Sequence, residues 1–210
     1  MPDAKKISEL TSQALDQFEA TDSVSALVRK AHRIASLRHD YPAQVWFTLQ
    51  VRDLSTSTKP DPEDLFALRG KLIALLGEKA GQREYNKQAR SWEATREMIG
   101  QPGKIHGASV GQIEALLAQV ERDYADMQIP SNLHPSDAYA ATKDLNKAKT
   151  KMVLDIGSLT NVLSRIRQAT HDYLIATETE IDAGRADSSF FTHVYLEISP
   201  GCACCRGVIG

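Results

Sequence analysis

The chain has 210 residues, of which 42% are apolar, and its 25 basic and 27 acidic side chains give a net charge of -2. These values exclude the strongly basic composition that would by itself indicate a nucleic-acid-binding protein, and they argue against wholesale disorder. The longest stretch without a charged residue covers 11 residues, from Tyr41 to Val51, whereas a bilayer-spanning helix needs roughly 18 to 20, so no transmembrane helix is predicted.

Apolar residues recur at helical spacing in three segments near the N-terminus. The predicted helices span residues 6–20, 23–37 and 42–54. Asp22 or Ser23 is suited to cap the second of them, because a short polar side chain can accept hydrogen bonds from the first turn. Pro42 is suited to begin the third, since its missing N–H group would have no partner there.

The next segments predict a linker and three more helices. Residues 55–64 contain short polar residues, two prolines and an acidic pair, which is typical of a linker. Residues 62–99 keep a helical spacing, and we expect one long helix that Gly77 and Gly81 can bend, with a leucine-rich start deep in the core. Predicted helices then cover residues 109–127, after a Ser109–Gln112 capping-box pattern, and residues 139–181.

These patterns predict an all-α fold, a bundle of about six helices of which two are long. A short β-like segment, residues 190–198, and a flexible tail are expected to follow. We expect an N-terminal three-helix unit in residues 1–54, a long-helix bundle in residues 63–184, and the strand-like segment with its cysteine-containing tail in residues 185–210.

Ser164 to Tyr173 is the segment best suited to catalysis. Arg167 and His171 are four residues apart and share a helix face, where a guanidinium could hold a phosphate while an imidazole moves a proton. The segment resembles the Arg-x4-6-His motif of HEPN-domain ribonucleases: Arg165 has that spacing from His171, and toxin members often carry Tyr two residues after the His. The resemblance implies a metal-independent ribonuclease acting as a dimer. The alternative is a solvent-exposed helix face.

A row of lysines lies on the last predicted helix. Lys143, Lys147 and Lys151 recur at every fourth residue, which places them on one face. Such a row can bind an anionic polymer such as RNA, or a lipid surface. The alternative is again a solvated face.

Cys202, Cys204 and Cys205 are the three cysteines of the chain, and all lie in the tail. Thiols this close can hold a soft metal ion, carry a membrane-anchoring acyl group or crosslink chains on oxidation, and an incidental cluster is a further alternative. The tail could also be cleaved, which would make the chain a substrate or precursor. The polar N-terminus lacks a signal sequence and predicts a cytoplasmic protein, and no cofactor is predicted.

Residues 23–54 are similar to the N-terminal helical module of AbiTii-type abortive-infection proteins. The matching positions are Leu27, Lys30, Ala31, Ile34, Ala35, Ser36 and Leu37 in one helix and Trp46 in the next. Residues 163–181 are similar to a later helix of these proteins. The resemblance implies a bacterial antiphage protein whose partners are other defence proteins or a second copy, and it supplies no catalytic residues. We therefore expect a non-enzymatic helical effector or adaptor, with the ribonuclease and the precursor as alternatives.

Overall fold

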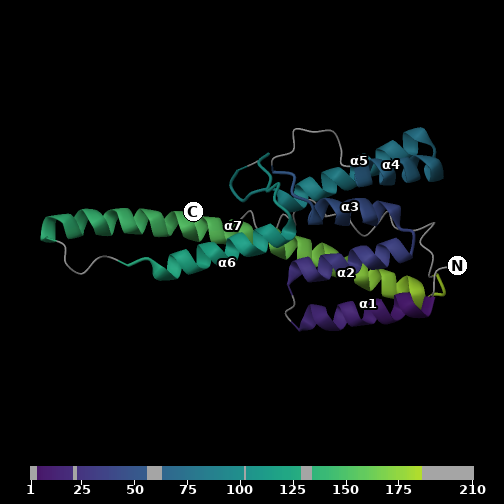
Figure 1. The fold of residues 1–210 in the computed structure, drawn as a ribbon, viewed down its shortest axis with the longest axis horizontal. Coiled ribbons are helices and arrows are strands. Elements are labelled where there is room, and N and C mark those ends of the chain that lie inside the picture. Colours follow the sequence, from purple (N-terminus) through teal and green to yellow (C-terminus); the bar gives the residue numbers. More distant parts are fainter. Residues whose placement is uncertain (1–3, 21–22, 56–62, 102, 129–133, 186–210) are drawn as a thin grey trace, which may run out of the picture.

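The structure, a computed structural model, describes residues 4–20, 23–55, 63–101, 103–128 and 134–185. Within these residues it contains seven helices and no strand, which confirms the all-α prediction (Figure 1). The helices are α1 (Ala4–Glu19), α2 (Val24–Leu37), α3 (Tyr41–Val51), α4 (Glu63–Leu76), α5 (Glu78–Arg96), α6 (Val110–Asp126) and α7 (Pro135–Asp182). The predicted β-like segment and the tail lie outside the described residues.

Polar caps start three of these helices, and two of the caps, at Ser23 and at Ser109, are those that the sequence predicts. Ser23 accepts a hydrogen bond from the Ala26 N–H group (3.1 Å) at the start of α2. Asp40 does the same for Ala43 (3.1 Å) at the start of α3, whose first turn contains Pro42. The predicted capping box of Ser109 and Gln112 is present at the start of α6, so both donors there are satisfied.

The prediction of one helix across residues 62–99 is wrong. The chain reverses at Gly77, whose φ of +83° is strained for any residue with a side chain, and α4 and α5 lie side by side as a hairpin (Figure 1). The two helices approach closely at Gly81: a Cβ atom added there would lie only 2.6 Å from the Ile73 backbone. Nor is α4 deep in the core: Leu65, Leu68 and Leu72 are its buried residues, and its remaining surface is largely exposed.

The longest helix, α7, belongs to two parts of the molecule. Its second half packs against α1, α2 and α5. There Ile166 and Tyr173 join Trp46 and Phe47 in one hydrophobic core, which extends across both predicted helical units. Its first half pairs with α6 and projects away from the other helices (Figure 1). We call residues 114–126 and 135–157 the arm and the other described residues the body.

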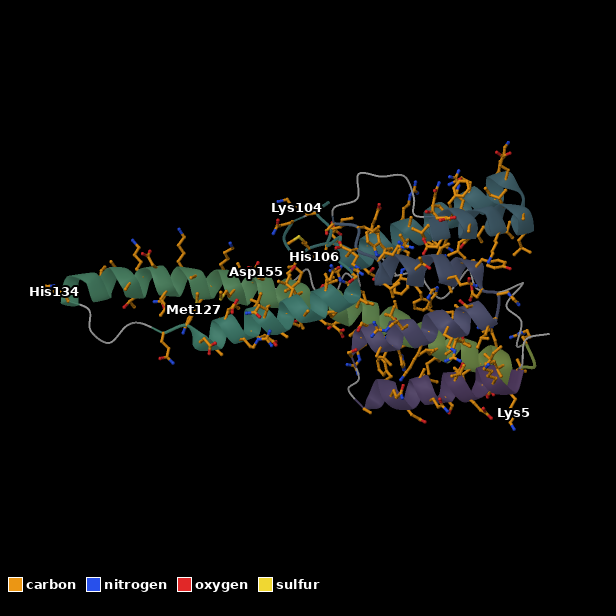
Figure 2. All side chains as sticks on the ribbon, in the orientation of Figure 1. Lys5, Lys104, His106, Met127, His134 and Asp155 are labelled. Carbon is orange, nitrogen blue, oxygen red and sulfur yellow. The ribbon has the colours of Figure 1, made fainter. Side chains whose placement is uncertain are left out.

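The arm has little core of its own. No side chain described for the arm is fully buried, whereas Ile113 and Leu159 at its base are. His134 lies at the far tip and Asp155 nearer the body (Figure 2). In the described part of the chain, no helix is both long and apolar enough to cross a membrane.

Candidate functional site

Arg167 and His171 share a face of α7, as their spacing predicts, and that face meets α1. The Arg167 guanidinium donates a hydrogen bond to the Phe18 carbonyl and lies over the Phe18 ring, 4.6 Å from its centroid. The His171 ring packs on the same phenyl group with 4.3 Å between ring centroids. Both candidate catalytic side chains therefore contact one residue in the last turn of α1.

Arg165 has an equivalent contact at the end of another helix. Its guanidinium donates to the carbonyls of Ala94 (2.8 Å) and Glu97, at the C-terminal end of α5. Burial lowers the pKa of Arg165 below its usual value, although the nearby Glu97 carboxylate opposes this shift. Carbonyls in a last helical turn have no partner within their helix, and the macrodipole makes that end attractive to cations. Arg165 and Arg167 therefore act as clamps that fix α5 and α1 to α7.

Tyr173 is inaccessible in the body core. Its side chain is 0% exposed and packs edge-on against Phe47, with 5.1 Å between ring centroids. Burial raises the pKa of the Tyr173 hydroxyl well above its usual value, and the Asp40 carboxylate raises it further. A substrate phosphate on the Arg167 face could not reach this hydroxyl without opening the core.

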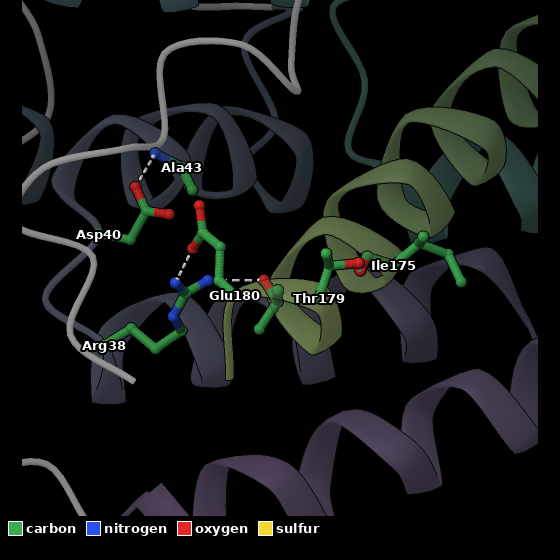
Figure 3. Close-up of polar contacts among 7 residues, drawn as sticks. Arg38, Asp40, Ala43, Ile175, Thr179 and Glu180 are labelled. Carbon is green, nitrogen blue, oxygen red and sulfur yellow. Dashed lines mark hydrogen bonds and ion pairs between the residues drawn. The ribbon is translucent and has the colours of Figure 1, made fainter. Parts of the chain in front are cut away.

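A buried polar cluster that the sequence analysis missed lies beside Tyr173. Arg38 forms an ion pair with Glu180 and donates a hydrogen bond to the Thr177 hydroxyl (2.8 Å) (Figure 3). Burial opposes the charge on Arg38, but Tyr173, Glu180 and Asp40 together raise its pKa above the usual value. The cluster joins the end of α2 and the start of α3 to the last turns of α7.

Helical periodicity contains a signal for this cluster. Arg38 continues the apolar stripe of α2 three or four residues after Ile34 and Ala35, and Glu180 continues the stripe of Tyr173 and Thr177 on α7. A charged residue on an apolar stripe is either a break in the stripe or a buried, paired group. Opposite charges at the ends of two such stripes would have suggested a buried ion pair. The pair of Arg38 and Glu180 joins α2 to α7 and is almost fully buried.

A second buried arginine, Arg96, anchors the loop between α5 and α6. Its guanidinium donates to the Gln50 side chain (2.7 and 2.9 Å), to the Gln50 carbonyl (3.0 Å) and to the carbonyls of His106 and Ala108. No carboxylate is among these acceptors, and burial lowers the pKa of Arg96 to about 10. Burial, with the Arg96 charge, also lowers the pKa of His106, which lies in this loop (Figure 2).

The predicted lysine row lies on the arm. Lys143, Lys147 and Lys151 are exposed on α7, and Lys149 beside them lies over the Tyr124 ring of α6, 5.6 Å from its centroid. Several large apolar side chains are also exposed on the arm: Tyr139 (78%), Leu154 (69%), Val153 (51%) and Leu116 (46%). The arm therefore carries a row of lysines beside exposed apolar side chains, together with the exposed acidic residues Glu121, Asp123, Asp126, Asp144 and Asp155.

The remaining candidate residues do not form a site in the described residues. Cys202, Cys204 and Cys205 lie outside them. No group of three His, Cys, Asp or Glu side chains in the described ranges is placed to hold a metal ion.

No family model, curated protein or solved structure matches the chain. The similarities to AbiTii-type proteins and to HEPN ribonucleases therefore stay expectations from the sequence.

Proposed function

We propose that this protein is a non-enzymatic helical adaptor or effector of a bacterial antiviral, abortive-infection-type system, and that it acts through protein partners or self-association. The observation that carries the proposal is the projecting arm with its exposed apolar side chains. The antiviral setting rests on the similarity of residues 23–54 and 163–181 to AbiTii-type proteins.

The surroundings of the candidate catalytic residues support a non-enzymatic role. Arg165 and Arg167 each donate to carbonyls at a helix end, His171 packs on Phe18, and Tyr173 is buried. General acid-base catalysis needs a titratable group within hydrogen-bond reach of a substrate. In this arrangement the two arginines contact helix ends and Tyr173 is buried, as residues that stabilise a fold do, whereas His171 packs on Phe18 and stays 31% exposed.

The arm supports a role in binding. Helices in proteins gain most of their stability from packing an apolar face, and the arm buries little of its own apolar surface. Leu154 and Val153 are adjacent on α7 and more than half exposed, beside Lys151. Exposed apolar groups rimmed by polar residues are typical of protein interaction surfaces. A partner or a second copy that covers them would add the burial that the arm lacks.

The test compares plating efficiency of a phage panel on cells that carry the wild-type chain or its variants. We expect the wild-type chain to reduce plating, His171→Phe to keep this protection, and the double variant Val153→Glu/Leu154→Glu to lose it. His171→Phe keeps a ring against Phe18 but removes the proton-transfer group. Phe66→Glu, which changes an apolar side chain that is 66% exposed on the body, is the matched control for the arm variant.

Three results would overturn the proposal. Loss of protection in His171→Phe with an unchanged melting temperature would favour catalysis. Full protection by the arm variant would remove the arm from the activity, and absence of protection by the wild-type chain across the panel would remove the antiviral role.

A further inference from the structure

A basic groove runs along the outer face of α5. Lys79, Arg83, Lys87 and Arg90 follow one another at intervals of three or four residues, so they share one helix face over about 16 Å. The groove that they line has a volume of about 800 Å³. Its other described lining residues are Glu78, Gln82 and Asn86.

The acidic residues at this end of the fold lie at the two ends of the groove or on another face of α5. Glu84 is buried on another face of the helix, where it accepts a hydrogen bond from Gln88 (2.8 Å). Glu93 and Glu97 follow Arg90 on the same helix face and, together with Arg90 itself, line a neighbouring hollow of about 420 Å³. Only Glu78, at the N-terminal end, adds a negative charge to the groove lining described above. The positive charge is therefore concentrated on about three helical turns.

Unlike the arginines that join helices, the two groove arginines have no hydrogen-bond acceptor among the described residues. Arg38, Arg96 and Arg165 all donate to carbonyl, carboxylate or hydroxyl oxygens. Across the described ranges, no hydrogen-bond or ion-pair partner lies within reach of the exposed Arg83 and Arg90. These guanidiniums are not needed to hold helices together, and their donors are available to a ligand.

We propose that the α5 groove binds the sugar–phosphate backbone of a nucleic acid without reading its base sequence. Arg and Lys bind phosphate oxygens through charge, and Asn and Gln amides also commonly donate to the backbone. Gln82 donates to the Asn86 side-chain oxygen (2.8 Å), which leaves the Asn86 NH₂ group as a donor. None of the described lining residues is aromatic, so none of them offers a platform on which unpaired bases could stack, and these residues favour a duplex over a single strand.

An acidic peptide is the alternative ligand for this groove, because its carboxylates could pair with the same cations and the aliphatic stems of the Lys and Arg side chains could contact its apolar atoms. It therefore enters the experiment below as a competitor. The net charge of -2 for the whole chain does not oppose the proposal, because the relevant charge is local. The inference goes beyond the adaptor role, and it does not depend on the arm.

The experiment measures fluorescence anisotropy of a labelled duplex of about 20 base pairs, as DNA and as RNA, titrated with the full chain at several salt concentrations. Four phosphate contacts predict a slope of log affinity against log salt of about -3 to -4 on DNA, at roughly -0.9 per contact. The variant Arg83→Gln/Arg90→Gln should weaken binding at least about tenfold at low salt and reduce the slope by about 2. Both side chains are exposed, so this variant should fold normally.

The matched control removes two charges from the other basic row of the protein. Lys147→Gln/Lys151→Gln on the arm should leave both affinity and salt slope unchanged, because these lysines line neither of the two hollows on α5. Absence of binding at low salt would overturn the proposal. So would an equal loss in the arm variant, which would assign binding to the arm. The proposal would also be overturned, in favour of an acidic protein segment as the ligand, if a polyglutamate peptide displaced the labelled duplex at a lower concentration of charges than unlabelled duplex does.

Discussion

Two fully buried arginines, Arg38 and Arg96, are stabilised by different chemistry. Arg38 faces the Glu180 carboxylate and lies near Asp40, and its pKa is raised despite burial. Arg96 faces only neutral oxygens, and its pKa is lowered to about 10. A buried charge without a counter-charge costs free energy that its hydrogen bonds must offset. The two sites therefore respond differently to mutation.

Arg38→Met should destabilise the protein strongly. The substitution leaves Glu180 as a buried carboxylate without its ion-pair partner, and removal of one member of a buried pair costs about 3 to 5 kcal/mol. The matched control is Arg52→Met, because Arg52 pairs with Asp64 at a site where both side chains are more than a third exposed. Such surface pairs contribute about 0 to 1 kcal/mol. Urea unfolding of both variants measures the difference, and equal losses would contradict the buried-pair interpretation.

Stability should fall as the pH drops below about 6.5. Burial lowers the pKa of His32, with Asp64 acting in the opposite direction, and burial together with Arg96 lowers the pKa of His106. Between the folded pKa values and the ordinary value of about 6.5, the unfolded chain binds more protons than the folded chain, so protons favour unfolding. The free energy of unfolding should therefore be lower at about pH 5.5 than at pH 7.

Two single variants test the origin of this pH dependence. His32→Asn and His106→Asn should each flatten the change in unfolding free energy between about pH 7 and pH 5.5, because each removes a group that titrates differently in the two states. An unfolding free energy that is constant or higher at the lower pH would contradict the prediction.

The limits of sequence reasoning at this scale are visible at Arg167. Its spacing correctly places it on one helix face with His171. What that face contacts is set by tertiary packing, because Phe18 lies 149 residues earlier in the chain. A pattern of four residues cannot distinguish a phosphate from a carbonyl as the acceptor of a guanidinium. The apolar stripes of α2 and α7 did contain a signal for Arg38 and Glu180, since both residues continue them.

At the scale of elements, periodicity predicted helices better than the breaks between them. The segments that became α1, α2, α3, α6 and α7 were predicted within a few residues of their observed ends. The α4–α5 hairpin was missed because the helical spacing continues through Gly77, and a sequence does not reveal whether such a glycine adopts a positive φ. The basic row of α5 was also missed, although its residues lie within the predicted helix and their spacing of three or four is close to that of the predicted lysine row on the arm.

Two glycines of this hairpin should respond oppositely to alanine. At Gly81 a Cβ atom would lie 2.6 Å from the Ile73 backbone, so Gly81→Ala must push α4 and α5 apart and should cost about 1 to 3 kcal/mol. At Gly70 no atom lies within 4 Å of the added Cβ, so Gly70→Ala should stabilise by up to about 1 kcal/mol through helix propensity. Urea midpoints measure both changes, and stabilisation by Gly81→Ala would show that the helices are not in close contact.

The whole molecule divides by packing into a body with a continuous core and an arm without one. The body core joins residues from all seven helices, and among the residues described α7 contributes to it only from Leu159 onward. Composition and periodicity predicted the helices of both parts, but not that a long helix would leave the bundle halfway along its length. Whether each half of α7 is covered depends on which other helices the fold places beside it, and helical spacing within α7 does not contain that information.

Hydrogen exchange should show the arm as the less stable part. Local opening costs least where few apolar side chains are buried, so amides of residues 116–125 and 140–155 should exchange faster than those of α3 and of α7 beyond Leu159. Mass spectrometry of peptides from the full chain measures both regions. If the arm binds a second copy, its protection should increase with protein concentration while protection of the body stays constant. Arm amides as slow as core amides at every concentration would contradict the division, because they would require buried surface that two helices alone do not provide.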